Sequence, residues 1–95
     1  MNLRDIKKDI EYVIGAFVDD CTLFLNMNPG KNSEEIIGLI DESVDLFNTL
    51  RDRVAKPEGE KKAFYFSIRK ELIEKVDALY DRLSAAVKKG LEQKA

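Results

Sequence analysis

The chain has no histidine, no tryptophan and only one cysteine, Cys21, among its 95 residues. Without histidine it cannot form a Ser/His or Cys/His nucleophile pair, an HExxH zinc site or the Glu-x-x-His motif of di-iron bundles. A single cysteine excludes an intramolecular disulfide and a CxxC metal cluster. No other cofactor-binding motif occurs, so the sequence predicts a non-enzyme with no catalytic residue, no metal and no cofactor.

Long apolar runs are also missing. The longest run, Tyr12–Val18, is far shorter than the roughly 20 residues that cross a bilayer, and the charged first residues do not form a signal peptide. Because Cys21 has no partner in the chain, nothing requires an oxidising compartment, and its helical position predicts a buried small hydrophobe. We therefore expect a cytoplasmic protein that does not associate with membranes.

A strong charge of one sign is absent as well. Sixteen basic and 18 acidic side chains give a net charge of −2, which argues against a general nucleic-acid binder. Residues 55–95 are net basic and the two preceding segments are acidic, which favours packing of these segments beside one another. The alternative is weak binding of an anion or a nucleic acid by the third helix, through Lys61, Lys62, Lys70, Lys88 and Lys89.

Two prolines and five glycines interrupt an otherwise continuous pattern. Apolar residues recur every three or four positions from Leu3 to Leu91, with breaks at residues 28–30 and around Pro57 and Gly59, and this spacing predicts amphipathic helices. We expect one domain, residues 1–95, with helices at roughly 3–25, 33–54 and 59–92. The short connections favour an all-α, antiparallel up-down-up three-helix bundle with a long C-terminal helix.

The residues at the predicted helix starts are good capping residues. Asn2 is predicted to cap the first helix through its side chain, and either Asn32 or Ser33 to cap the second. Pro57 suits the first turn of the third helix because it lacks the N–H that a first turn leaves unbonded.

Each predicted helix has one apolar face. For the first helix this face is Leu3, Ile6, Ile10, Val13, Ile14, Phe17, Cys21 and Phe24. For the second it is Ile36, Ile37, Ile40, Val44, Phe47 and Val54, widened by Leu39, Leu46 and Leu50. For the third it is Tyr65, Leu72, Val76, Leu79, Leu83 and Ala86.

The third helix carries an additional apolar row at seven-residue spacing, and this row is the candidate interaction surface. One interpretation is that the row packs inside the bundle, where each helix contacts two others; the other is that part of it meets another chain, as a homodimer or a partner groove. The long third helix is expected to overhang the bundle. The leading functional hypothesis is a non-catalytic protein-interaction or self-associating module that uses Phe66, Ile73, Tyr80 and Val87.

Charged side chains support weaker hypotheses. Carboxylates at Glu42-x-x-Asp45 and Glu71-x-x-Glu74 leave open a small magnesium-dependent enzyme or ligand-binding bundle, although helical projection points both pairs toward solvent. Near the apolar faces, Arg69 and Asp20 would set the helix register if they paired. We expect instead that Arg69 extends its charge to solvent and that Asp20 lies at the rim.

Overall fold

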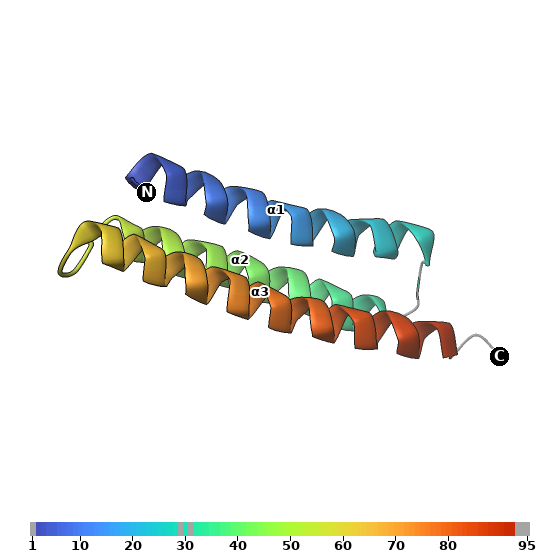
Figure 1. The fold of residues 1–95 in the computed structure, drawn as a ribbon. Helices are drawn as coiled ribbons and strands as arrows, with labels where there is room; N and C mark the ends of the chain where they lie inside the picture. Colours follow the sequence, from blue (N-terminus) through green and yellow to red (C-terminus); the bar gives the residue numbers. More distant parts are fainter. Residues whose placement is uncertain (1, 29, 31, 93–95) are drawn as a thin grey trace.

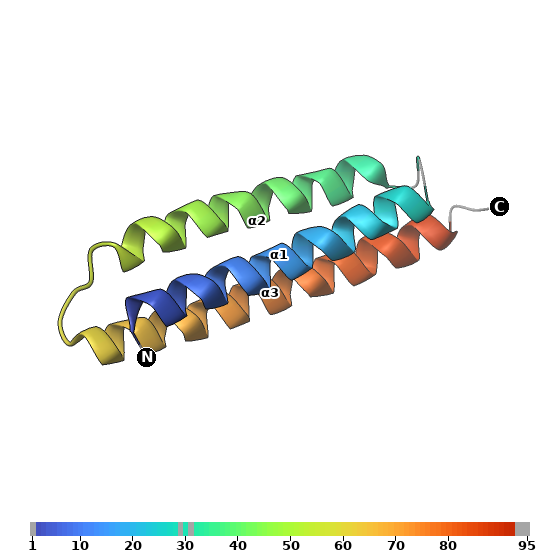
Figure 2. The same cartoon turned by 90° about the horizontal axis from the view of Figure 1, so that it is seen from above.

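The computed structural model describes residues 2–28, 30 and 32–92, with side chains up to residue 90. Three helices follow one another in the chain: α1 (Leu3–Met27), α2 (Ser33–Val54) and α3 (Lys61–Glu92). Figures 1 and 2 show that α1 and α3 run in the same direction and α2 in the opposite one. Every helix contacts both others, and no strand occurs in the described residues, so the predicted all-α three-helix bundle is confirmed.

The first helix begins as its sequence predicts. The Asn2 side chain accepts a hydrogen bond of 2.9 Å from the backbone N–H of Asp5, which satisfies one of the unbonded donors of the first turn. The helix continues to Met27, two residues beyond the predicted end at residue 25, and the Asn28 N–H still bonds to the Phe24 carbonyl at 3.0 Å.

The start of α2 differs from the prediction. Asn32 adopts a left-handed backbone (φ 51°) and its side chain does not cap α2. Instead, its amide Nδ2 donates to the Ala86 carbonyl on α3 at 2.9 Å. The Ser33 hydroxyl accepts from the Gly30 N–H at 3.1 Å, which stabilises the preceding turn. Asn32 therefore joins the start of α2 to a residue of α3 that lies 54 positions further along the chain.

The connection between α2 and α3 is longer than predicted. α3 begins at Lys61 rather than at residue 59, so Pro57 precedes the helix and does not occupy its first turn. Gly59 has a positive φ of 71°, a conformation that glycine adopts without the steric cost of a Cβ atom. The chain enters the helix after this bend, where the Glu60 carbonyl accepts from the Phe64 N–H at 2.9 Å.

A continuous apolar core lies between the three helices. On α1 the buried residues all belong to the predicted face, and on α3 all six predicted residues are buried together with Ile68, which the prediction omitted. The core also includes Ile36, Leu39, Leu50 and Val54 from α2.

The buried face of α2 is rotated relative to its prediction. Ile37 and Val44 were predicted to be buried but are 49% and 45% exposed, whereas Ser43 is completely buried. The Ser43 hydroxyl donates to the Ile40 carbonyl at 2.7 Å, so it enters the core with its hydrogen bond satisfied. The structure differs from the prediction because a serine, which an apolar pattern does not include, occupies the centre of the buried face of α2.

The long third helix is covered along most of its length. Figure 2 shows α3 extending beyond α1 and α2 at both ends of the bundle. Ala86 is 1% exposed and Val87 packs against the core, so any overhang of α3 at this end begins beyond Val87. Within residues 2–28, 30 and 32–92, no helix is both long enough and apolar enough to cross a membrane.

Candidate interaction surface

The predicted row on α3 divides into an exposed half and a covered half. Phe66 and Ile73 are 67% and 45% exposed, whereas Tyr80 and Val87 are partly buried against the core. Seven residues of a straight α-helix fall about 20° short of two turns, so a row at this spacing drifts by about 60° over three heptads. The row therefore turns from solvent toward the core between Phe66 and Val87.

Tyr80 connects α3 to α1 in the covered half of the row. Its ring meets that of Phe17 edge-on, with centroids 5.0 Å apart and planes at 88°. Its hydroxyl donates to the Asp20 carboxylate at 2.6 Å. Burial and this hydrogen bond raise the pKa of Tyr80 to about 12, so the phenol stays protonated and remains a donor near neutral pH.

Cys21 lies behind this contact and is buried, as predicted. Burial and the negative charge of Asp20 raise the pKa of its thiol to about 11. Because the thiolate is the reactive form of cysteine, a buried thiol with this pKa is a poor nucleophile. Cys21 therefore acts as a packing residue.

An open groove of about 380 Å³ lies beside Tyr80, between the C-terminal halves of α1 and α3. We call it the second groove, in chain order along α3. Its walls are mainly apolar, and Asp20, Ser84 and Lys88 add polar groups. Leu23, on its α1 wall, is 54% exposed. The other apolar side chains of the groove are Phe24, Tyr80, Leu83 and Val87.

Another hollow, of about 460 Å³, lies beside the exposed half of the row. This first groove is lined by two apolar residues, Phe66 and Ile73, and two cations, Arg69 and Lys70. The two grooves thus lie one after the other along α3, and each includes two members of the row. We use the name α1–α3 face for Leu23, Phe24, Phe66, Ile73, Tyr80 and Val87.

Arg69 and Asp20, which would set the helix register if they paired, make two separate contacts. Arg69 Nε lies 3.6 Å from Asp9 Oδ2, and Asp20 accepts from Tyr80, so Arg69 and Asp20 do not pair with each other. Both contacts join residues that are sixty positions apart, which places α1 and α3 in a common register. This register places Leu23 in the α1–α3 face. The sequence did not predict this position, because Leu23 lies outside the apolar face of the first helix.

Ion pairs cross the rim between α3 and α2. Arg82 lies 2.7 Å from Glu42, and its hydrogen bond lowers the pKa of that carboxyl. Arg53 pairs with Glu71 at the other end of this contact. Lys75 lies 3.7 Å from the same Glu71 carboxylate, one helical turn away.

These ion pairs bear on the proposed magnesium sites. The first carboxylate of each acidic pair, Glu42 or Glu71, is already bound to an arginine. Glu42 and Asp45 line a hollow of about 340 Å³ together with two cations, Lys75 and Arg82. Among the described residues, no three or more potential metal ligands gather into one group.

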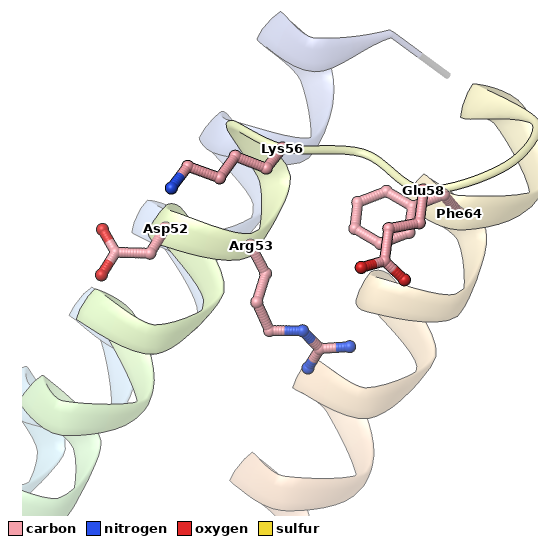
Figure 3. Close-up of a pocket in the computed structure, with 5 residues that line it drawn as sticks. All are labelled: Asp52, Arg53, Lys56, Glu58 and Phe64. Carbon is pink, nitrogen blue, oxygen red and sulfur yellow. The ribbon is translucent and has the colours of Figure 1, made fainter.

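A further hollow of about 300 Å³ lies where α2 ends and α3 begins. Figure 3 shows Arg53 extending toward α3, while Asp52 and Lys56 project to the other side and Glu58 lies in front of Phe64. Two cations and two carboxylates line this hollow, and Arg53 already has Glu71 as its partner. Its charges therefore compensate each other without an added ion.

No protein-family model matches the chain, and no curated protein or solved structure matches it either. The α1–α3 face is the candidate site that the described residues offer. Leu23, Phe66 and Ile73 place about half or more of their apolar surface in solvent there, beside grooves that can receive other side chains.

Proposed function

We propose that this chain is a non-catalytic helical interaction module that binds a protein surface, its own or another, through the α1–α3 face. The observation that carries the proposal is the exposure of Phe66 at 67%, next to Ile73 at 45%, on a helix whose other side is already packed. Contiguous exposed apolar surface beside a groove is typical of protein interaction sites. The free, buried Cys21 is compatible with a cytoplasmic location, which is part of this proposal.

Three of the groups considered for chemistry, Tyr80, Glu42 and Glu71, make contacts between helices. Tyr80 binds Asp20, while Glu42 and Glu71 bind arginines, so these polar side chains hold the helices together. The five lysines of the anion-binding hypothesis are distributed along α3, with Lys70 in one groove and Lys88 in the other. The apolar side chains are what the face offers to a partner, and apolar burial is the main driving force of most protein association.

The proposal is tested by affinity purification from the native cell with matched variants. Ile73→Glu places a charge on the face, and Ile37→Glu places the same charge at an isoleucine of almost equal exposure on α2, 49% against 45%. We expect a specific set of bound proteins, the chain itself included, that is lost with Ile73→Glu and retained with Ile37→Glu. If no bound protein distinguishes the two variants, the proposal is wrong.

A further inference from the structure

We propose that the occupant of the α1–α3 face is a second copy of this chain, placed antiparallel across a two-fold axis that passes beside α3 midway between Val76 and Asp77. This inference rests on the proposed function and adds the partner and its orientation.

The spacing of the row favours a two-fold arrangement. When two copies of α3 run antiparallel about that axis, Phe66 of one copy lies level with Val87 of the other, and Ile73 lies level with Tyr80. The exposed half of each row, Phe66 and Ile73, then faces the covered half of the other. A two-fold interface requires such a self-complementary surface, because each patch must meet its opposite on the second copy.

The grooves match in the same register. The first groove, at residues 66–73 of α3, comes level with the second groove, at residues 80–88, of the other copy. Leu23 is level with Leu83, since the contacts between α1 and α3 join residues sixty positions apart. Leu23, 54% exposed, therefore faces the first groove of the second copy, and Phe66 faces the second groove.

The charges around the grooves are complementary in this arrangement. Arg69 and Lys70 border the first groove, and Asp20 borders the second. Lys70 of one copy comes within about one helical turn of Asp20 of the other, and the symmetry repeats this approach. Lys88 comes within one residue of the level of Phe66 of the other copy, where an aromatic ring can accept an ammonium group.

A carboxylate next to the axis opposes the arrangement. Asp77 is exposed and lies next to the two-fold axis, so the two copies bring two carboxylates toward each other. Like charges that approach across an interface weaken it. Removing this charge should therefore strengthen a two-fold dimer. Binding of a partner with a different sequence should not respond in this way, because the two Asp77 carboxylates meet only when two copies of this chain associate.

The area of the face indicates the class of interface. From Phe66 to Val87 the row is about 30 Å long, and a strip one to two helices wide gives about 500 Å² per copy, or about 1,000 Å² in total. This lies at the lower end of specific protein interfaces. We therefore expect a reversible dimer with a dissociation constant in the micromolar range.

The first experiment measures self-association of the purified full chain by sedimentation equilibrium, from low micromolar to near-millimolar concentration. We expect a monomer–dimer equilibrium that Phe66→Glu weakens by at least about tenfold. Asp77→Asn should strengthen it by a few fold, and Ile37→Glu, on α2, should leave it unchanged. Leu23→Glu provides a second disruptive variant on a different helix, and circular dichroism verifies that each variant is folded.

The second experiment determines the orientation by electron spin resonance distances between the copies, in a Cys21→Ala background. A spin label at Asp77→Cys should lie within about 20 Å of its counterpart, whereas a label at Lys62→Cys should lie about 40 Å or more from its own. Short distances at both positions would indicate a parallel dimer and overturn the proposal. A chain that remains monomeric at the highest concentration also overturns it.

The two proposals fail in different ways. If the purified chain is monomeric but Ile73→Glu still removes a different bound protein in the affinity experiment, the interaction module stands and the second copy is wrong. If neither measurement responds to substitutions in the α1–α3 face, both proposals are wrong.

Discussion

The two sides of α3 are stabilised by different means. Toward α2, Arg53 pairs with Glu71 and Arg82 with Glu42, so long charged side chains cross between the helices. Toward α1, the described polar contacts are the hydrogen bond from Tyr80 to Asp20 and the longer approach of Arg69 to Asp9. The Tyr80 ring also packs on Phe17, and apolar grooves lie beside these contacts.

This difference separates the part of the surface that serves the fold from the part that is available for binding. Charged side chains can cover apolar surface with their stems while they keep their charges in water, and they do so between α2 and α3. On the other side, Leu23 and Phe66 remain uncovered in the single chain. The comparison predicts that substitutions toward α1 affect stability or association strongly, and that those toward α2 have small effects.

The largest expected effect comes from the core beneath the α1–α3 face. Phe17 is completely buried and packs against Tyr80, so Phe17→Ala removes apolar burial and leaves a cavity. We expect a loss of about 3–5 kcal/mol in the free energy of unfolding, measured by urea denaturation. A loss below about 1 kcal/mol would show that Phe17 does not anchor α1 against α3.

A smaller effect should appear on raising the pH. The folded protein raises the pKa of Tyr80 from 10.0 to about 12, so the unfolded chain releases this proton first as the pH rises. Stability that is fully present below pH 10 is therefore lost as the pH approaches 12. The buried thiol of Cys21, whose pKa rises from 9.0 to about 11, adds a loss of the same sign that begins near pH 9.

Tyr80→Phe is the control for this pH dependence. It removes the hydroxyl and its bond to Asp20, so we expect a loss of about 1 kcal/mol near neutral pH and a shallower decline between pH 10 and 12. Chemical unfolding at a series of pH values gives both quantities. Parallel pH profiles for the original chain and Tyr80→Phe would contradict the assignment of Tyr80.

The smallest effect is expected at the contact between α2 and α3. A double-mutant cycle with Arg53→Met and Glu71→Gln should give a coupling free energy of about 0.2–1 kcal/mol, because both side chains are partly exposed to solvent. Added salt should reduce this coupling further. A coupling above about 2 kcal/mol would mean that charge, rather than apolar packing, holds this side together.

The sequence predicted most of what depends on local periodicity. Asn2 caps α1 as expected, and the predicted core residues of α3 are buried. These features were readable because a capping side chain bonds within its own turn and because a buried stripe repeats at the helical period.

Two predictions were wrong where packing against a neighbouring helix decides the role of a polar side chain. Asn32 has the chemistry of a helix cap, yet its amide binds Ala86 on α3. Ser43 is polar, yet it lies in the core with its hydroxyl bound to the preceding turn. For Asn32 the neighbouring α3 supplies the partner of the amide, and for Ser43 the packing of α2 places in the core a side chain whose hydrogen bond is satisfied within its own helix.

The candidate surface was predicted as one row, and the structure divides it. The sequence alone determined three amphipathic helices, the approximate positions of the breaks between them and the presence of a second apolar row on the third, since these follow from spacing and turn residues. Only the tertiary structure decided that Tyr80 and Val87 turn toward α1 while Phe66 and Ile73 face solvent, and that Leu23 joins them. The reason is geometric. A row at seven-residue spacing drifts around its helix, and the position of the neighbouring helix decides which members of the row are covered.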